Sequence, residues 1–346
     1  MKTSGSTTRF HYDESFYRGK RVLVLGGLGF IGQNLVRALA ALGSDARVVD
    51  LTSDSSRTLG DFPTKRRVYY ADRCEKKLVD REIHTADIIF NLAGRSGVAD
   101  SFRYPRESLR ANCMQHLSVL QACHEHNPDA IVVFPSSCLV YRELPVTQTL
   151  GVREHEPIYP LCPYAVHKYT CEMYSRLYRE VHGLSTVILR ISNPIGPYQY
   201  RVDSGYGVYN QFIYLATNDR DITVYGEGTQ IRDIIGVDDV VQAFLYCASA
   251  ATVVDTVNVG RGVGITLRDY AQLVVDVVGR GRVTHIDWPV DSKSLPPTDF
   301  VADISRICSL TNWQPDTDLR ATIATTAEFY RWAGVNSLII SGERKC

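Results

Sequence analysis

The chain has 346 residues, 45% of them hydrophobic and 22% charged, which is the composition of a globular protein with a large core. Lys plus Arg and Asp plus Glu both number 38, so no global basic field exists to recruit nucleic acid or an anionic membrane. Nine cysteines without short Cys or His spacing exclude a disulfide framework and a metal site, and no apolar run is long enough for a signal peptide or a membrane span, so we expect a soluble cytoplasmic protein.

The first predicted element is a strand at residues 21–26, a continuous apolar run that ends in glycine. A GxxGxxG loop follows at residues 26–32 and leads into a predicted helix that reaches about residue 42. Glycines let the backbone approach a pyrophosphate, and the helix N-terminus offers unpaired N–H groups and a positive dipole end. The pattern predicts a dinucleotide site at Gly26, Gly29, Phe30, Ile31 and Gly32.

Carboxylates at the ends of the next strands indicate the kind of dinucleotide. Asp50 ends the predicted strand at residues 46–50, where it would bond the adenosine ribose and repel a 2′-phosphate, so NAD is favoured over NADP. The third predicted strand, residues 67–72, brings Asp72 within reach of the adenine amino group, and Arg73 is assigned to the same site. The fourth, residues 86–94, ends in Leu92, Ala93 and Gly94, where a nicotinamide ribose can lie close to the main chain.

Residues 104–126 are predicted to be helical, and the fifth strand, at residues 129–135, leads into Ser136, Ser137 and Cys138. Open α/β sheets bind ligands at this edge. A second long helix, residues 160–182, carries Tyr164 and Lys168 one turn apart on the same face. A cation held close to a phenol lowers its pKa from about 10, so Tyr164 is predicted to act as a general base.

A sixth strand at residues 186–190 completes an alternating pattern, which predicts an α/β protein with a doubly wound parallel sheet. After about residue 194 the pattern loosens into helices at 205–216, 237–249 and 267–278, an extended stretch at 222–225, and a strand at 257–260 that returns to the sheet. We expect a nucleotide-binding domain at 20–193 with about 237–262, a smaller α/β substrate-binding lobe at 194–236 and 263–335, an N-terminal extension at 1–19 and a tail at 336–346.

With these residues assembled, the chain resembles the nucleotide-sugar epimerase and dehydratase branch of the extended short-chain dehydrogenase/reductase family, from about residue 20 to about residue 332. The matching motifs are the glycine loop, Asp50, residues 91–94, Asn112, residues 136–141, Tyr164 with Lys168, residues 189–197, residues 225–233 and residues 237–239. The resemblance implies a Rossmann-type fold that binds NAD, with Asn112 in the cofactor site. It also implies that Tyr164 is the base for a sugar hydroxyl, Lys168 its tuner and ribose anchor, and Ser137 the hydroxyl that holds the reacting oxygen.

The resemblance also implies a substrate, a nucleoside diphosphate sugar. Asn193, Asn210 and Arg232 are expected to contact it, and a guanidinium fork at Arg232 suits the diphosphate. Ser96 and Cys138 are assigned to the same site. Arg142 replaces a glycine of the family and could, like Arg95, favour a carboxylated sugar.

Two positions separate the reactions of this branch. Dehydratases that resemble the chain carry Asp and Glu where Cys138 and Leu139 stand, and leucine cannot move protons. Cys138 is interpreted as a small structural residue. The leading hypothesis is therefore an isomerase of carbohydrate biosynthesis, an NAD-dependent 4-epimerase of a UDP-hexose or UDP-hexuronate. The alternatives are a 4,6-type dehydratase that uses Cys138, a 4-ketoreductase, and a non-catalytic nucleotide-binding protein. By the same resemblance, helices 104–126 and 160–182 would pair with their copies to form a four-helix homodimer interface.

Overall fold

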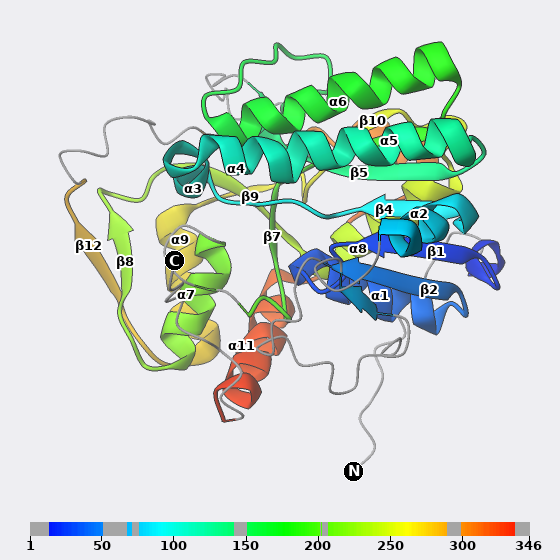
Figure 1. Ribbon diagram of the computed structural model, residues 1–346. Coiled ribbons are helices and arrows are strands. Elements are labelled where there is room, and N and C mark those ends of the chain that lie inside the picture. The colour runs from blue at the N-terminus through cyan, green and yellow to red at the C-terminus, as the bar shows by residue number, and fades with distance from the viewer. Residues whose placement is uncertain are drawn as a thin grey trace.

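The structure is a computed structural model that describes residues 14–50, 68–70, 76–141, 151–200, 202, 207–288 and 299–335. Its centre is a seven-stranded sheet with the order β10-β6-β5-β4-β1-β2-β3 (Figure 1). Every pairing in this sheet is parallel. The predicted α/β class with a Rossmann-type doubly wound sheet is confirmed.

The strands are short, and their residues are largely buried because helices cover both faces of the sheet. Their bounds are Arg21–Leu25 (β1), Asp45–Asp50 (β2), Val68–Tyr70 (β3), Ile88–Asn91 (β4), Ile131–Ser137 (β5), Thr186–Ile191 (β6) and Thr256–Val259 (β10). Alternate side chains of β1 enter different clusters, Val22 and Val24 on one face and Leu23 and Leu25 on the other. The continuous apolar runs in the sequence therefore reflect a sheet with a hydrophobic core on each face.

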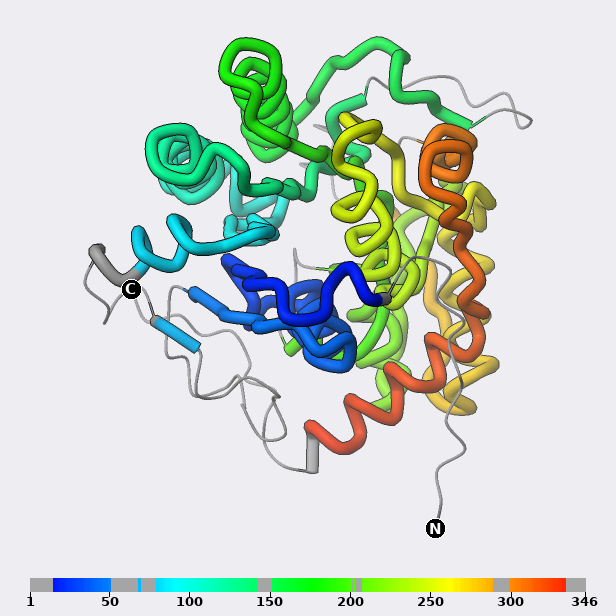
Figure 2. Tube along the Cα trace, turned by 90° about the vertical axis from the view of Figure 1, so that its right-hand side faces the viewer, coloured from blue at the N-terminus to red at the C-terminus, as the bar shows by residue number. Residues whose placement is uncertain are grey.

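Different helices cover the two faces (Figures 1 and 2). On one face α5 (Gln115–His126) and α6 (Pro163–His182) lie side by side, with α2 (Lys76–Thr85) next to α5. On the other face α1 (Phe30–Ala41) packs against α8 (Val237–Ser249). The strand predicted at residues 257–260 does return to the sheet, because β10 pairs with β6, and α8 packs in the same hydrophobic cluster.

The helix predicted over residues 104–126 is present, but it is not uniform. Helices α3 (Val98–Arg103) and α4 (Pro105–Leu109) precede a π-helical turn at Arg110–Met114, which continues into α5. Such turns inside α-helices occur frequently at functional sites. This one buries Asn112 and Cys113.

A second hydrophobic cluster lies in the chain after residue 193. Its elements are β7 (Asn193–Ile195), α7 (Val208–Thr217), β8 (Ile222–Tyr225), β9 (Ile231–Gly236), β11 (Gly264–Thr266), α9 (Leu267–Val278), β12 (Val283–Ile286) and α11 (Leu319–Val335). Strands β7, β9 and β11 form one small sheet, and β8 pairs with β12. Helix α10 (Ser305–Thr311) lies beside β10. The division into nucleotide and substrate units stays a prediction.

The described part of the segment expected to extend from the fold belongs to the core. Tyr17, in a 3-10 turn at Glu14–Tyr17, is fully buried, and its hydroxyl donates a 2.6 Å hydrogen bond to the carbonyl oxygen of Leu245. The first described turn therefore packs against α8 and is hydrogen-bonded to it.

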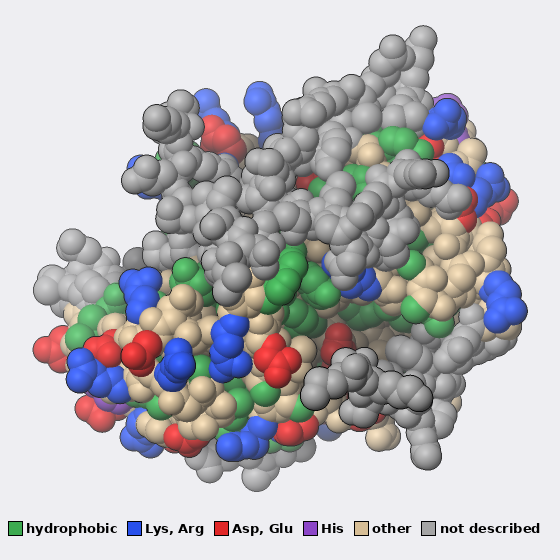
Figure 3. Space-filling view, turned by 90° about the horizontal axis from the view of Figure 1, so that it is seen from below, with side chains coloured by type: hydrophobic (Ala, Val, Ile, Leu, Met, Phe, Trp, Pro, Cys, Tyr) green, Lys and Arg blue, Asp and Glu red, His purple; other side chains and the backbone are tan. Residues whose placement is uncertain are grey.

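Charges of both signs are interspersed over the described surface seen from below (Figure 3), in keeping with the zero net charge. Within the described ranges, no helix has both the length and the apolar character to cross a bilayer. The same residues contain no group of three or more His, Cys, Asp or Glu side chains that could hold a metal ion.

Candidate active site

A cavity of about 2490 Å³ opens at the carboxyl ends of the parallel strands. It is lined by residues at the ends of β1, β2, β4, β5 and β6 or just after them, and by residues of the second cluster. Strands β1 and β4 are neighbours in the sheet, although the chain leaves β1 toward β2 on the other side. Open α/β sheets bind ligands at such a switch point.

The glycine loop forms one wall of this cavity. Gly26 has a φ of +76°, and a Cβ there would lie 2.8 Å from the backbone nitrogen of Ala93. Helix α1 begins at Phe30 without a side-chain cap from the described residues, and its N-terminus faces the cavity. Asp50, at the end of β2, accepts a 2.9 Å hydrogen bond from the backbone N–H of Leu28. This close-packed loop, its helix N-terminus and the carboxylate fit a dinucleotide.

The residues predicted to bind the cofactor are brought together. Those that line the cavity are Gly26, Gly29, Phe30, Ile31, Gly32, Asp50, Leu92, Ala93, Gly94, Asn112, Tyr164 and Lys168. Asp72 and Arg73 lie outside the described residues, and their assignment stays a prediction.

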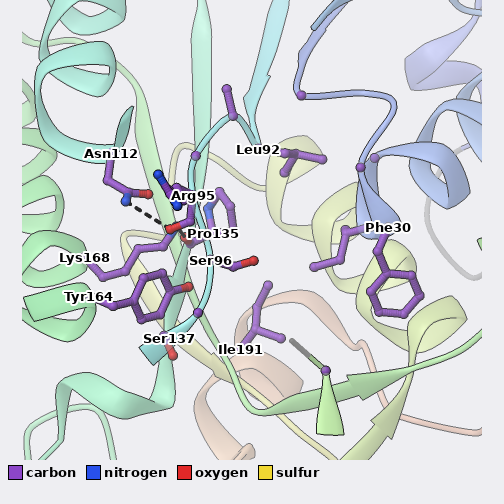
Figure 4. Close-up of a pocket in the computed structure, with 18 of the residues that line it drawn as sticks. Phe30, Leu92, Arg95, Ser96, Asn112, Pro135, Ser137, Tyr164, Lys168 and Ile191 are labelled. Carbon is purple, nitrogen blue, oxygen red and sulfur yellow. Dashed lines mark hydrogen bonds between the residues drawn. The ribbon is translucent and has the colours of Figure 1, made fainter. Parts of the chain in front are cut away.

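Tyr164 and Lys168 project from the first turns of α6, and Ser137 ends β5 (Figure 4). The Tyr164 backbone N–H donates a 3.1 Å hydrogen bond to the hydroxyl of Ser101 in α3, which fixes the start of α6. The Lys168 ammonium donates a 2.6 Å hydrogen bond to the carbonyl oxygen of Pro135 and lies 5.8 Å from the centre of the Tyr164 ring. The three predicted catalytic side chains thus lie at one corner of the cavity.

The expected net result, a Tyr164 pKa below its ordinary value, is wrong for this arrangement. Burial raises the pKa of Tyr164 well above its ordinary value, and the neighbouring Cys138 and Cys162 raise it further. Burial also lowers the pKa of Lys168 to about 8. The physical reason is that the ammonium is hydrogen-bonded to Pro135 rather than to the phenol, while both groups are removed from water.

Asn112 holds the loop that follows β4. Its side-chain amide donates hydrogen bonds to the carbonyl oxygens of Arg95, at 3.1 Å, and Ser108, at 2.9 Å (Figure 4). The π-helical turn places this amide against the loop that carries Arg95 and Ser96, both of which line the cavity. Asn112 therefore joins the helix to the strand end.

Cys138 is 8% exposed, and burial raises the pKa of its thiol to about 12. Asp233 is close enough to add to that rise, but it is fully buried and accepts hydrogen bonds from the backbone N–H groups of Arg261, Gly262 and Ala302. Leu139 is 40% exposed and presents an apolar side chain to the cavity. At this corner Cys138 is therefore a neutral thiol, and the Asp233 carboxylate accepts hydrogen bonds from backbone N–H groups rather than facing a substrate.

The strand end that carries Ser137 rests on a buried ionic network. Arg190 and Glu172 are 1% and 0% exposed, and their charged groups approach to 2.7 Å. The Ser136 hydroxyl hydrogen-bonds to the same carboxylate, and Arg190 donates to the Tyr141 hydroxyl at 2.9 Å. The network joins β5, β6 and α6, which supply the corner of the site.

A buried histidine forms a second polar link behind the site. The His116 ring is hydrogen-bonded to the side chain of Asn91, at 2.9 Å, and to the Ser175 hydroxyl, at 2.8 Å. Burial and, to a smaller extent, the nearby Lys168 ammonium lower the pKa of His116 to about 3. His116 therefore connects β4, α5 and α6 as a neutral ring.

Most of the residues predicted to contact the substrate line the cavity, and one does not. Ser96, Ser137, Cys138, Asn193 and Arg232 line the cavity, whereas Arg142 lies outside the described residues. The prediction for Asn210 is wrong. Its side chain is fully buried, because the amide bonds the backbone of Gly196 and the side chain of Gln199.

The neighbour of Asn210 was missed by the sequence reasoning. Tyr209 lines the cavity, as Arg232 does, and burial raises the pKa of its hydroxyl to about 12, against the lowering effect of the Arg232 charge. The sequence shows a helical pattern here but does not establish which face of the first turn meets the site.

The chain matches a family model described as the NAD dependent epimerase/dehydratase family over residues 22–260. It is 29% identical over 306 residues to a putative UDP-glucose 4-epimerase of Methanocaldococcus jannaschii, an alignment that covers 87% of this chain and 95% of that protein. It is 26% identical over 325 residues to a dTDP-glucose 4,6-dehydratase of Streptomyces niveus, covering 90% and 93%. The solved UDP-glucose 4-epimerase of Thermus thermophilus in complex with NAD matches with a TM-score of 0.78 and 26% identity, covering 90% of this chain and 99% of that one.

Proposed function

The chain belongs to the NAD-dependent epimerase/dehydratase family, and from this premise we propose that it interconverts a nucleoside diphosphate sugar and its C4 epimer. The observation that carries the proposal is the corner of the cavity at Ser137, Tyr164 and Lys168. Beside it stand a neutral Cys138 and an apolar Leu139, where dehydration would need a further acid and base. Epimerisation at C4 needs only the three residues present.

Each of these residues has a defined part in the proposed reaction. Tyr164 takes the proton from the C4 hydroxyl and returns it after the 4-keto sugar has turned over. Ser137 donates a hydrogen bond to the same oxygen. Lys168, with a pKa of about 8, keeps its proton at pH 7, and its charge opposes the penalty that burial imposes on a Tyr164 phenolate. Bound NAD supplies a nicotinamide ring that can hold a hydride between the two half-reactions.

The substrate class that we propose is a UDP-hexose or a UDP-hexuronate. Its support is the similarity to proteins named as UDP-glucose 4-epimerases. The cytoplasmic location remains a prediction from the sequence.

A panel of nucleotide sugars tests the function. UDP-glucose, UDP-N-acetylglucosamine and UDP-glucuronate are each incubated with purified enzyme and NAD, and the anomeric signals are followed by proton NMR. We expect at least one C4 epimer to accumulate. Tyr164→Phe should lower its rate by roughly 10³-fold, because general base catalysis contributes about 10²–10⁴-fold. Absence of every C4 epimer with the wild-type enzyme would contradict the proposal.

The same panel separates the two rival reactions. The similarity to the Streptomyces niveus enzyme makes dehydration the first rival reaction. A dehydratase would produce a nucleotide sugar lighter by one water. A 4-ketoreductase would change the nicotinamide absorbance in proportion to product. Epimerisation does neither, because hydride and proton both return to the sugar.

We also propose a homodimer formed through α6 and the helices before it. Exposed apolar side chains occur on α6 at intervals of four or seven residues, so they share one face. They are Val166, Met173, Leu177 and Val181, and Leu109 and Met114 are exposed on the neighbouring helical stretch. On the same stretch Cys113 and Leu120 are buried inside the protein and cannot contribute to this surface. A second copy would remove this stripe from water.

A further inference from the structure

We propose that the buried ion pair of Glu172 and Arg190 positions the catalytic hydroxyl of Ser137. The pair holds the chain on both sides of Ser137 and so directs its hydroxyl to the sugar oxygen that faces Tyr164. Neither charged side chain lines the cavity, so both act as positioning residues. The inference rests on the proposed function for the identity of the reaction, and it assigns two buried charges that the mechanism does not otherwise use.

The geometry of the ion pair is fixed. Arg190 of β6 donates through Nε, at 3.0 Å, and through Nη2, at 2.7 Å, to the two carboxylate oxygens of Glu172 in α6. This two-pronged arrangement sets the orientation of a guanidinium on a carboxylate. Arg176 also approaches the carboxylate, at 3.7 Å, and Arg190 lies beside Ser136 in the pairing of β6 with β5. The pair therefore offers fixed hydrogen-bonding points next to the strand end.

The chain before Ser137 is held by α6. The Ser136 hydroxyl donates a hydrogen bond to the Glu172 carboxylate, and the Pro135 carbonyl oxygen accepts one from Lys168, at 2.6 Å. Lys168 and Glu172 are four residues apart, so two consecutive turns of one helix hold two consecutive residues of β5. Successive side chains of a strand point to opposite sides, so fixing the Ser136 side chain also fixes the direction of the next one.

The chain after Ser137 is held by the same guanidinium. A 3-10 turn at Cys138–Val140 follows the serine, and Tyr141 comes directly after that turn. Arg190 donates through Nη1 to the Tyr141 hydroxyl, at 2.9 Å, and this hydroxyl donates to the Asn258 side chain of β10, at 2.6 Å. The strand end and the turn that flank the serine are therefore anchored to one ion pair.

The Ser137 hydroxyl held in this way can donate a hydrogen bond to a substrate. Its oxygen accepts a 3.2 Å hydrogen bond from the backbone N–H of Leu139, inside the anchored turn. A hydroxyl oxygen that accepts this bond still has its own proton to donate. Ser137 lines the cavity at the same corner as Tyr164 (Figure 4). A sugar oxygen bound there would receive a hydrogen bond from the serine while the phenol exchanges the proton of that oxygen.

Two variants release the turn and leave the ion pair intact. Ser136→Ala and Tyr141→Phe each remove one hydroxyl, and the Glu172 charge keeps its partner. Substituting the carboxylate itself would leave a buried guanidinium without its counter-ion and destabilise the fold. The matched control is Ser175→Ala, which removes another buried hydroxyl of α6, one that is hydrogen-bonded to His116.

Steady-state kinetics on the best substrate of the panel distinguish positioning from structural support. We expect kcat to fall by about 10- to 100-fold in Ser136→Ala and in Tyr141→Phe, because misplacing a reacting group by about 1 Å can cost about 10²-fold. KM should stay within about twofold of the wild type, since substrate binding is not what the hydroxyls support. Ser175→Ala should match the wild type in both constants. A loss of folded protein alone would lower the number of active sites, which NAD titration counts, and not the rate of each site.

A double-mutant cycle shows whether the effect passes through the serine hydroxyl. If it does, adding Ser136→Ala to Ser137→Ala should slow the enzyme by no more than about twofold further, because the hydroxyl to be positioned is already gone. Amide hydrogen exchange measures the hold on the turn without turnover. In Ser136→Ala and in Tyr141→Phe, exchange at the Leu139 N–H should be faster than in the wild type.

The outcomes separate the inference from the proposed function. A wild-type kcat in either variant, unchanged exchange at Leu139, or fully multiplicative losses in the cycle would overturn the inference and leave C4 epimerisation intact. If the wild-type enzyme instead releases water or changes the nicotinamide absorbance, the proposed reaction is refuted. The same cycle, run on that reaction, still decides the inference, because Ser137 and Tyr164 would face the reacting oxygen there as well.

Discussion

Cys138 occupies one of the two positions that distinguish dehydration from C4 epimerisation. Its thiol has a pKa raised to about 12 and is 8% exposed, so it is neutral at physiological pH and poorly placed to exchange protons. A thiol in this state acts as a small packing group.

Cys138→Ala should therefore retain C4 epimerase activity within about threefold of the wild type, because no proton passes through the thiol. The measurement is the initial rate on the best substrate of the panel. Cys162→Ala, a buried thiol at the start of α6, controls for the loss of packing volume. A fall of about 10²-fold or more in Cys138→Ala alone would assign the thiol to the chemistry.

At the residue scale, the sequence predicted the cavity residues that belong to a motif. It failed where the direction of a single side chain decides whether a residue reaches the cavity. The glycine loop, Asp50, Tyr164 and Lys168 belong to patterns whose spacing has one structural meaning. Asn210 and Tyr209 are neighbours on a helix, so a rotation of about 100° decides which of them meets the cavity. The pKa of Tyr164 was mispredicted because it depends on burial, which spacing does not reveal.

His116 connects three elements, and its protonation would break that connection. Its pKa is lowered to about 3, whereas an unfolded chain restores the ordinary value of about 6.5. Between these values the unfolded chain binds a proton that the native ring does not. The stabilisation is thus fully present above about pH 6.5 and is lost as the pH falls toward about 3.

His116→Gln should flatten the acid side of the stability profile. Urea unfolding at intervals from about pH 6.5 to about pH 4.5 measures the free energy of unfolding, whose slope should fall by up to about 1.4 kcal/mol per pH unit relative to the wild type. The slope is compared rather than the absolute value, because the substitution also changes packing. His126→Gln, on the exposed end of α5, is the control. Equal slopes for His116→Gln and the wild type would contradict the assignment.

At the scale of elements, the long periodic segments and the short stretch at residues 222–225 were predicted well, whereas β7 and β11 were not predicted. Helices α8 and α9 begin and end where the sequence indicated. Strands β7 and β11 contain three residues each, too few for any periodicity to establish. The π-helical turn escaped prediction because it arises from packing of the helix against the strand-end loop, through Asn112.

At the scale of the whole molecule, four apolar side chains on one face of α6 are exposed to solvent: Val166, Met173, Leu177 and Val181. Leu177→Glu should convert a dimer into a monomer, because a second copy would have to bury the new carboxylate. Size-exclusion chromatography with light scattering gives the mass. Val253→Glu, at an exposed apolar position away from α6, should remain dimeric. A monomeric wild type, or a dimer that survives Leu177→Glu with an unchanged melting temperature, would contradict the proposed interface.

Strand β10 enters the sheet beside β6 only after the chain has built β7, β8 and β9, and α8 carries the carbonyl that receives the hydroxyl of Tyr17. On the ribosome, the apolar edge of β6 is therefore without its neighbour until residue 259 has been made. The hydrophobic core around the first six strands is therefore incomplete until α8 and β10 have been synthesised. A fragment ending near residue 193 is expected to aggregate rather than bind a nucleotide.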